Sequence, residues 1–304
     1  MPYSTLVLTR NEAHNLGRCL DSLAACDDVV VLDSFSTDAT PAIAAARGVR
    51  FHQRAFDTFA GQRNWAIDNL TFRHPWVLHL DADECVTPAL HAELTAVTAR
   101  DERSAYLLAN RLIFMGRWIR RASMYPFYQA RLLRLGEARF TQRGHGQILD
   151  VATRGVGTLR EPYVHHNFSR GITDWVARHN RYSSDEAARI VAERAGHGAA
   201  AATGPGTGPE ARQQALKRLA RHIPFRPLVR FLYLYVWRGG FLDGRPGFDY
   251  SVLMAFYDYL TRLKVREALA DRAAGGPGAV DRPAAAGDGP AAAAHRRGDA
   301  GAGA

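Results

Sequence analysis

The feature that most constrains this chain is an alternation of short apolar runs with helical patterns over its first hundred residues. Apolar runs occupy residues 6–8, 29–32 and 76–80, and the stretches between them carry apolar side chains at helical spacing, as at Leu16 and Leu20. This alternation is typical of β-α-β units, whose parallel strands are buried beneath helices. We therefore expect an α/β fold built on a Rossmann-like, mostly parallel sheet.

The pattern changes after about residue 100. Strand-like segments at 105–114 and 131–135 predict an antiparallel addition to the sheet. The chain then reads as helical from Phe168 to about Arg194, and again at 211–222, 228–237 and 250–268. We therefore expect a sheet domain at 1–165, followed by a helical C-terminal region at 166–270.

Two segments lack any apolar periodicity. Residues 196–211 are rich in Gly, Ala and Pro and predict a flexible insertion, and residues 271–304 predict a disordered tail. The composition of the tail cannot supply enough apolar surface to offset the loss of chain entropy on folding.

Charge and cysteine content narrow the class of partner and the compartment. The chain has 39 Lys and Arg against 30 Asp and Glu, a net charge of +9, which favours anionic partners such as phosphorylated substrates, nucleic acids or an anionic membrane. Three cysteines and no secretory signal predict a protein of the reducing cytoplasm. The apolar stretch at 225–242 is interrupted by arginines, so it should not span a bilayer.

Polar clusters follow three of the predicted strands, at 9–12, 33–38 and 81–84. Ligands of open α/β sheets bind beyond the carboxyl ends of the strands, which is where these clusters should meet. Asp81 and Asp83 are two residues apart, and carboxylates in this arrangement suit Mg²⁺ or Mn²⁺ shared with a diphosphate. No Gly-rich dinucleotide motif or Walker-type phosphate loop is present, so a metal and basic side chains should hold the phosphates.

These clusters belong to a larger set of motifs. In order along the chain they are Leu-Thr-Arg-Asn-Glu at 8–12, Val-Leu-Asp-Ser-Phe-Ser-Thr-Asp at 31–38, Gly-Gln-Arg-Asn-Trp-Ala at 61–66, Leu-Asp-Ala-Asp-Glu at 80–84, Gln-Ala-Arg-Leu-Leu-Arg at 129–134, His-His-Asn-Phe at 165–168 and Gly-Phe-Leu-Asp-Gly-Arg-Pro-Gly at 240–247. Their order and spacing resemble the inverting, GT-A-fold glycosyltransferases of family 2, in the branch related to lipopolysaccharide-core glucosyltransferases. The resemblance extends to about residue 268.

The resemblance implies transfer of a sugar, with inversion, from a nucleoside diphosphate donor such as a UDP-sugar. The acceptor would be a hydroxyl of a membrane-associated glycan, for example lipopolysaccharide core or a lipid-linked saccharide. It also implies donor-binding roles for Thr9, Asn11, Glu12, Asp33, Ser36, Asp38, Arg63, Asn64 and Asp81. The metal, Mn²⁺ or Mg²⁺, would be held by Asp81, Asp83 and His165. Carboxylates suit ribose hydroxyls, and arginine suits phosphate oxygens.

The general base departs from the family pattern. An inverting transfer needs a base within hydrogen-bond reach of the acceptor hydroxyl. The branch carries a Glu where this chain has Gly146, so the candidates are His145, Asp150 and Glu84.

Arginines alternate with aromatic side chains near the C-terminal helices. Arg226 and Arg238 flank the segment 228–237 and Arg230 lies within it, which favours an interfacial membrane segment over a solvated face or a nucleic-acid surface. We expect a cytoplasmic protein that is peripheral on the inner face of the cytoplasmic membrane and that does not bind nucleic acid. The oligomeric state is not predicted.

Two other function classes remain open at this stage. A sugar-phosphate nucleotidyltransferase would share the nucleotide-binding sheet, but it usually carries a Gly-rich basic loop after the first strand. A non-catalytic nucleotide- or glycan-binding protein would be consistent with glycine at position 146.

Overall fold

The computed structural model describes residues 2–143, 146–151, 153–194 and 225–274. The expected insertion at 196–211, the helical pattern at 211–222 and almost all of the expected tail lie outside the described residues. So does His145. The last helix continues to Ala273, slightly past the position at which the tail was expected to begin.

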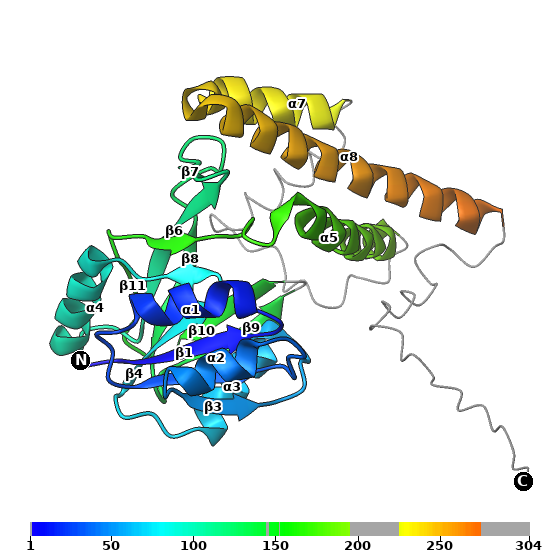
Figure 1. Ribbon diagram of the computed structural model, residues 1–304. Helices are drawn as coiled ribbons and strands as arrows, with labels where there is room; N and C mark the ends of the chain where they lie inside the picture. The colour runs from blue at the N-terminus through cyan, green and yellow to red at the C-terminus, as the bar shows by residue number, and fades with distance from the viewer. Residues whose placement is uncertain (1, 144–145, 152, 195–224, 275–304) are drawn as a thin grey trace, which may run out of the picture.

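The described chain forms a ten-stranded mixed sheet, in the order β3-β2-β1-β4-β8-β6-β12-β5, with β7 and β11 also paired to β6 (Figure 1). The strands are β1 (Ser4–Thr9), β2 (Val29–Asp33), β3 (Arg50–Gln53), β4 (Trp76–Asp81), β5 (Glu84–Cys85), β6 (Ala105–Phe114), β7 (Arg117–Trp118), β8 (Tyr128–Arg134), β11 (Val156–Thr158) and β12 (Tyr163–His165). A separate antiparallel hairpin consists of β9 (Ala138–Arg143) and β10 (Gly146–Val151).

The first four long strands run parallel, as the apolar runs predicted. β1 pairs with β2 and β4, and β2 pairs with β3, all in parallel register. The antiparallel addition is confirmed at β8, which pairs with both β4 and β6. β12 then returns parallel to β6, with His165 beside Leu112. The expected α/β class with a mostly parallel sheet is therefore observed.

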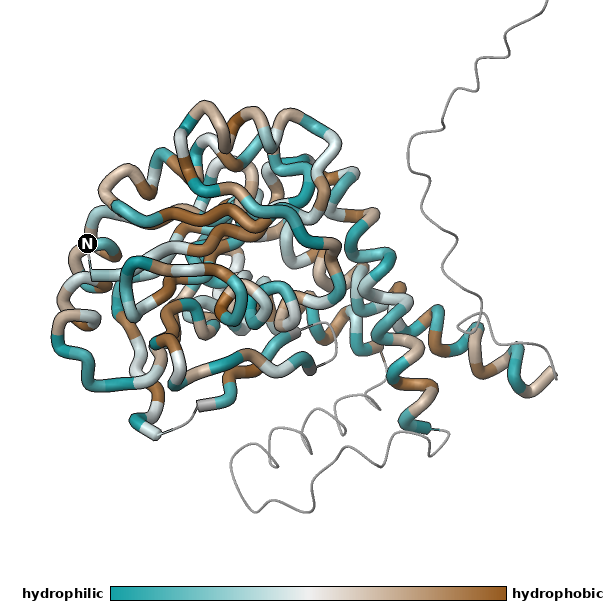
Figure 2. Tube along the Cα trace, turned by 90° about the horizontal axis from the view of Figure 1, so that it is seen from below, coloured by the Kyte–Doolittle hydropathy of each residue, from teal (hydrophilic) through white to brown (hydrophobic). Residues whose placement is uncertain are grey.

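Helices bury both faces of the parallel strands. They are α1 (Ala13–Ser22), α2 (Thr40–Ala46), α3 (Phe59–Asn69) and α4 (Pro88–Arg100). Alternate side chains divide between two cores: Val7 and Val31 pack with residues of α1, α2 and α4, whereas Leu6 and Val30 pack with residues of α3. The apolar strands accordingly lie in the middle of the fold in Figure 2. Burial on both faces explains why these strands read as continuous apolar runs.

The C-terminal part of the described chain is helical. Its elements are α5 (Gly171–Arg194), α7 (Arg226–Leu232), the π-helical turn η2 (Tyr233–Trp237), the 3₁₀ turn η3 (Gly240–Asp243) and α8 (Gly244–Ala273). α5 packs on α8 through Ala187, Val191, Val265 and Ala268. No helix within the described ranges is both long and apolar enough to cross a membrane.

Helix α8 begins six residues before the helical pattern expected at 250–268. Its first turns contain Gly244 and Gly247, residues that usually end or interrupt helices. Packing explains the second glycine, because a Cβ at Gly247 would lie 2.2 Å from the carbonyl oxygen of Gly240. The glycine permits η3 and α8 to approach closely.

Candidate active site

The loops that follow β1 and β2 are joined by hydrogen bonds at the carboxyl edge of the sheet. Asn11, which has a left-handed φ of 53°, accepts from the N–H of Thr37 at 2.8 Å, and its own N–H donates to Ser36 Oγ at 2.7 Å. The carboxylate of Asp38 accepts from the N–H of Ala13 at 3.0 Å. The two loops predicted to bind the nucleotide therefore form one hydrogen-bonded unit.

The carboxylate of Asp33 joins residues of both loops through hydrogen bonds. Its buried carboxylate accepts from Thr9 Oγ1 at 2.9 Å, from Gln53 Nε2 at 3.1 Å, and from both the N–H, at 2.8 Å, and the hydroxyl of Ser36. A carboxylate has about four acceptor positions, and protein donors fill them here. Asp33 and Thr9 thus lie where the sequence placed them, with their polar groups shaping the loop.

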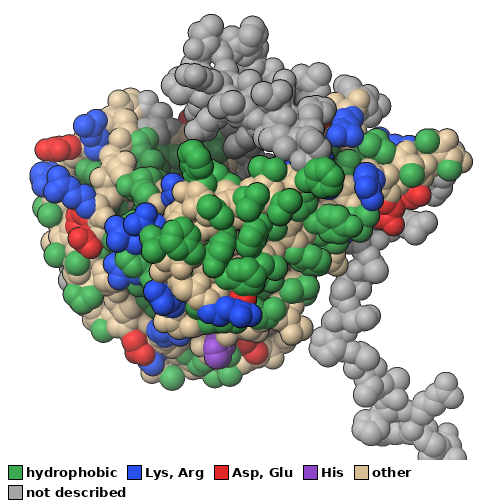
Figure 3. Space-filling view, turned by 90° about the horizontal axis from the view of Figure 1, so that it is seen from above, with side chains coloured by type: hydrophobic (Ala, Val, Ile, Leu, Met, Phe, Trp, Pro, Cys, Tyr) green, Lys and Arg blue, Asp and Glu red, His purple; other side chains and the backbone are tan. Residues whose placement is uncertain are grey.

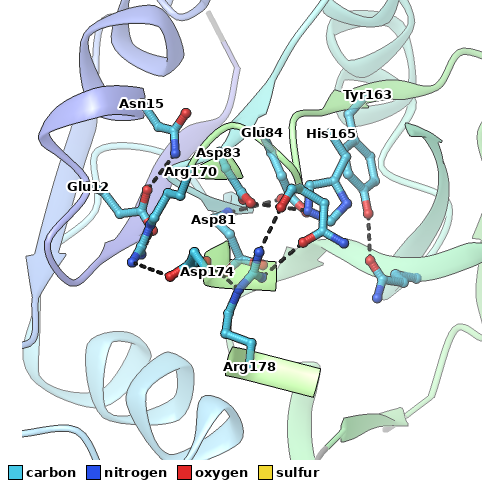
Figure 4. Close-up of polar contacts among 12 residues, drawn as sticks. Glu12, Asn15, Asp81, Asp83, Glu84, Tyr163, His165, Arg170, Asp174 and Arg178 are labelled. Carbon is cyan, nitrogen blue, oxygen red and sulfur yellow. Dashed lines mark hydrogen bonds and ion pairs between the residues drawn. The ribbon is translucent and has the colours of Figure 1, made fainter. Parts of the chain in front are cut away.

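Glu12 connects this edge to the start of α5. Its carboxylate accepts from Asn15 Nδ2 at 2.7 Å and forms an ion pair with Arg170, whose guanidinium also lies 3.7 Å from Asp174 (Figure 4). Burial raises the pKa of Glu12, while Arg170 and Asn15 act to lower it.

Asp81, at the end of β4, lies between two buried arginines. Arg63 Nη2 is 2.8 Å from Asp81 Oδ1, and Arg131 Nη2 is 3.0 Å from Oδ2. Burial alone would raise the pKa of Asp81, but Arg131 and Arg63 lower it to about 2. Burial lowers the pKa of Arg63 to about 10, which is still high enough for this guanidinium to be charged at neutral pH. The two arginines therefore keep Asp81 ionised.

Glu84 is fully buried beside Asp81. One of its oxygens forms an ion pair with Arg131, and the other accepts from the backbone N–H of Asp81 at 3.0 Å. Burial raises the pKa of Glu84, Arg131 opposes this change, and Asp81 adds to it. Because both oxygens are engaged, Glu84 supports the turn at 81–84.

Asp83 and His165 face each other across the end of β12. Asp83 Oδ2 lies 3.3 Å from His165 Nε2, both side chains are about one-fifth exposed (19% and 20%), and the N–H of His166 donates to the Asp83 carbonyl at 2.8 Å. Burial would raise the pKa of Asp83 and lower that of His165, but the attraction between the two side chains outweighs it in both cases.

This pair fits a divalent cation in its donor chemistry. A carboxylate oxygen and an imidazole nitrogen lie 3.3 Å apart, and Mn²⁺ or Mg²⁺ completes such a pair of ligands with water and phosphate oxygens. Among the residues that the structure describes, no group of three or more His, Cys, Asp or Glu side chains could hold a metal by itself. The third predicted ligand, Asp81, is directed to its arginines.

Helix α5 brings a further polar cluster to this edge. Arg178 donates from Nε to Asp174 at 2.8 Å, from Nη1 to Asn167 Oδ1 at 2.9 Å and from Nη2 to the Asn167 carbonyl at 2.7 Å. Arg170 and Arg178 both interact electrostatically with Asp83, and Figure 4 shows them around the carboxylates of the site. The first turns of α5 therefore form one wall of the candidate site.

Three of the predicted site residues lie elsewhere or outside the described residues. Asn64 uses its side-chain amide on β9, donating to the Phe140 carbonyl at 2.7 Å and accepting from the Phe140 N–H at 3.0 Å, so its contact with a diphosphate stays a prediction. Asp150 is exposed on β10 of the hairpin. His145 lies outside the described residues.

Two arginines of the site, Arg131 and Arg170, are not among the site residues predicted from the sequence. Arg131 stands in an apolar strand, and a buried arginine needs a carboxylate partner, so the sequence did carry a signal for it. Arg170 carries no such signal, because its partner Glu12 is 158 positions away and in a different motif.

Residues 4–163 match the family model described as Glycosyl transferase family 2. The chain belongs to glycosyl transferase family 2. This membership confirms the resemblance read from the motifs and identifies the chain as a glycosyltransferase. It decides against the nucleotidyltransferase and the non-catalytic alternatives.

The similar proteins span most of this glycosyltransferase. It is 28% identical over 273 residues to the lipopolysaccharide core biosynthesis glycosyltransferase LpsC of Rhizobium meliloti (strain 1021), covering 87% of this chain and 92% of LpsC. An uncharacterized glycosyltransferase of Rickettsia felis is 27% identical over 277 residues, covering 88% of this chain and 90% of that protein. Among solved structures, S. aureus TarS 1-349 in complex with UDP-GlcNAc aligns with a TM-score of 0.41 and 15% identity, over 92% of this chain and 88% of TarS 1-349.

Proposed function

We propose that this family 2 glycosyltransferase moves a sugar from a UDP-sugar to a hydroxyl of a membrane-associated glycan, with inversion at the anomeric carbon. The observation that carries the proposal is the pair formed by Asp83 and His165 at the carboxyl edge of the sheet. The nucleotide-binding loops after β1 and β2 lie at the same edge, and Asp83 interacts electrostatically with Glu12. In this proposal a cation site lies beside the nucleotide site.

Each part of the site has a proposed task. Glu12 and the loop organised by Asp33 hold the base and ribose. Asp83 and His165 hold Mn²⁺ or Mg²⁺, which neutralises charge on the departing diphosphate when it is bound. Arg131 and Arg63 keep Asp81 ionised, and we propose that its carboxylate contacts the ribose or the cation.

The base that accepts the proton of the attacking hydroxyl is proposed to come from the β9–β10 hairpin. Glu84 is a poor candidate, because it is fully buried and both of its oxygens are bonded. Asp150 is exposed on β10, but it lies opposite Arg139, which pairs with Asp68 near the end of α3, so it stands toward the amino edge of the sheet. His145 precedes β10 in the sequence and is the candidate that we favour. A base must reach the acceptor hydroxyl, which favours exposed groups over buried ones.

The proposed acceptor class follows from the relative named as a lipopolysaccharide core biosynthesis glycosyltransferase. A growing core is attached to a lipid, so we place the enzyme on the inner face of the cytoplasmic membrane. In this proposal the C-terminal helices, within residues 166–270, provide the acceptor and membrane side, while residues 1–165 bind the donor.

Binding of UDP in the presence of Mn²⁺, measured by calorimetry, tests the donor half of the proposal. The intact chain should bind UDP much more tightly with Mn²⁺ than with EDTA, and Asp83→Ala should abolish the difference while leaving the circular dichroism spectrum unchanged. Asp68→Ala, an exposed carboxylate paired with Arg139, provides the matched control. Equal Mn²⁺ dependence in Asp83→Ala would remove this residue from the metal site.

Turnover tests the reaction itself. Release of UDP from UDP-sugars should rise when a lipopolysaccharide-core acceptor is added, and a product of inverted configuration should appear. An intact protein that releases no UDP from any common UDP-sugar, with or without acceptor, would contradict the proposed donor class.

A further inference from the structure

Helix α7 and the turn η2 present apolar side chains to solvent. Trp237 is 83% exposed, Phe225 is 79% exposed and Leu228 is 57% exposed. No residue of α7 is buried, and in η2 only Leu234 is. The other exposed large apolar residues of this segment and of η3 are Val229, Leu232, Tyr233, Val236, Phe241 and Leu242. A helix of this length normally turns such residues toward the core.

The arginines of the same segment are instead directed toward the protein. Arg226 forms an ion pair with the buried Asp258 of α8 at 3.1 Å, and Arg238 donates to the carbonyl of Tyr125 at 3.1 Å. Arg230 is half-buried, and its charge acts on Tyr250 of α8. The segment is therefore amphipathic with its apolar side outward, and these three arginines are not the charges that it offers to a partner.

A second segment, residues 115–128, adds exposed side chains next to the first. Met115 is 61% exposed and Phe127 is 54% exposed, and Arg120 and Arg121 are exposed between them. The buried carboxylate of Asp243 in η3 connects the two segments, since it accepts from the backbone N–H groups of residues 120–122 at 2.8–3.2 Å. We call residues 115–128 and 225–245 together the basic-apolar surface.

The basic-apolar surface has a strong bias of charge. Of its seven arginines, four are exposed, namely Arg117, Arg120, Arg121 and Arg245, and the last of these pairs with Asp249. Its single acidic residue, Asp243, has its carboxylate occupied by three backbone groups. Figure 3, which looks down on the side of α7 and α8, shows hydrophobic side chains gathered over a broad area with Lys and Arg among them. Contiguous apolar patches of this kind mark interaction sites. Self-association would bring the exposed arginines of two copies, Arg117, Arg120 and Arg121, toward one another, which opposes a second copy as the occupant.

We infer that the basic-apolar surface docks on an anionic phospholipid bilayer. Aromatic and aliphatic side chains such as Trp237 and Phe127 enter the headgroup layer, while Arg120 and Arg121 meet lipid phosphates. This inference rests on the proposed function and deepens it, because it names the face through which the enzyme meets its lipid-attached acceptor.

The register of the sheet gives the orientation a functional consequence. His165 pairs with Leu112 on β6, and Met115 follows three residues later on the same chain. Three residues of strand span about 10 Å. The backbone at the candidate cation site is thus a short distance from the docked surface, so an acceptor anchored in the bilayer can reach it.

Sedimentation with vesicles tests the charges. The intact protein should bind vesicles of 70% phosphatidylcholine and 30% phosphatidylglycerol at low salt, and bind pure phosphatidylcholine far more weakly. Each basic residue near an anionic surface contributes about fivefold in affinity, so the double variant Arg120→Gln/Arg121→Gln should bind roughly 25-fold more weakly. The matched control, Arg47→Gln/Arg139→Gln, removes two exposed arginines of the sheet region and should bind normally. An intact protein that ignores the anionic vesicles, or a control that loses as much affinity as the test variant, overturns the inference.

A second comparison tests the apolar side chains. Trp237→Ser should lower vesicle affinity at least fivefold, whereas Val156→Ser, which changes an apolar residue 40% exposed on β11, should not. Both side chains are exposed, so folding should be preserved, which thermal unfolding checks. Ultracentrifugation of the same proteins addresses the other occupant: a dimer of the intact chain that Trp237→Ser dissolves would make this face an interface between copies and would overturn the membrane assignment.

These measurements need neither donor nor turnover, so the two proposals can fail separately. Vesicle binding without sugar transfer would leave the surface in place and reject the proposed reaction. The reverse result is a protein that binds no vesicles but transfers sugar to a soluble acceptor, at a rate that Arg120→Gln/Arg121→Gln does not change. This result would support the proposed reaction and reject the membrane surface.

Discussion

Single residues at the candidate site are arranged around buried charge. Arg131 is only 4% exposed and lies between the carboxylates of Asp81 and Glu84. Its Cζ atom also lies over the ring of Tyr163, 5.4 Å from the ring centroid. Breaking a buried pair costs more than the pair contributes, because the remaining charge keeps its full desolvation penalty. The site is therefore sensitive to loss of either sign of charge.

Replacing this arginine should show that sensitivity in stability. We expect Arg131→Met to lower the free energy of unfolding by about 3–5 kcal/mol, since Glu84 is left buried without its partner. The double variant Arg131→Met/Glu84→Gln should recover part of the loss. Urea denaturation measures both, with Arg139→Met, an exposed arginine, as the control. A loss below about 1 kcal/mol in Arg131→Met would mean that Glu84 is neutral in the folded protein.

The general base can be assigned by comparing two positions. A positioned acid-base group contributes roughly 10²–10⁴-fold to turnover, so His145→Ala should lower kcat by that factor. Asp150→Asn, at the end of the hairpin away from the candidate site, should change kcat far less. Donor affinity should stay close to that of the intact chain, because the base acts on the acceptor hydroxyl. Steady-state kinetics with saturating donor measure the effect. If both variants keep kcat within tenfold, the base lies outside this hairpin.

Whole elements were more predictable than their contacts. Apolar runs located β1, β2, β4 and β6, because strands buried on both faces carry apolar side chains at successive positions. β5 and β7 have two residues each and are too short for any period to be visible. The apolar stripe of α7 was also readable, but its outward direction depends on Asp258 of α8, which the local sequence does not reveal.

Some residues of the candidate site were likewise predictable from the sequence, and others were not. Strand-end carboxylates such as Asp81 and Asp83 were found because the carboxyl ends of parallel strands meet at one edge. The ion pair between Glu12 and Arg170 depends on where α5 begins in space, which no local pattern encodes. The contact of Asn64 with β9 was also not visible in the sequence, because its amide carries a donor and an acceptor and can pair with a strand backbone as readily as with a phosphate.

The start of β2 provides a prediction about pH. The buried carboxylate of Asp28 accepts from Ser4 Oγ at 2.5 Å, from the Arg73 N–H at 2.8 Å and from Arg50 Nη2 at 2.6 Å. Burial would raise the pKa of Asp28, but these donors lower it. A carboxyl whose pKa is lower in the folded state stabilises the fold above its unfolded pKa, near 3.9, and loses this contribution as pH falls through the folded pKa.

Acidification should therefore separate Asp28→Asn from the intact chain. At pH 7 the variant should be less stable by about 1–3 kcal/mol, because hydrogen bonds to a charged acceptor are lost. Between pH 5 and pH 2 the difference should shrink, since the intact chain loses its advantage on protonation. Urea midpoints at pH 7, 4 and 2.5 measure this. A difference that stays constant over the range would show that Asp28 is not the group responsible.

At the scale of the whole molecule, polar contacts join the sheet to the C-terminal helices. Arg170, just before α5, reaches Glu12 after β1, and Asp243 in η3 reaches the backbone after β7. Apolar contacts accompany them, since Phe114 of β6 packs against Phe168 and Tyr250. The helices are thus fixed to the sheet beside the candidate site, and the position of the basic-apolar surface depends on these contacts.

Removing the Asp243 carboxylate should loosen that attachment without unfolding the sheet. Asp243→Ala leaves the N–H groups of residues 120–122 without their acceptor, and an unsatisfied buried group costs about 1–3 kcal/mol. Hydrogen exchange followed by mass spectrometry should show faster exchange at 117–125 and in α7, with β1, β2 and β4 unchanged. Asp243→Asn, which keeps one acceptor oxygen, should lie between the variant and the intact chain. Because Arg120 and Arg121 lose their fixed position, vesicle affinity should fall in the same order. Uniformly faster exchange across the sheet would instead make Asp243 a determinant of global stability, and unchanged exchange at 117–125 would show that other contacts hold the two segments together.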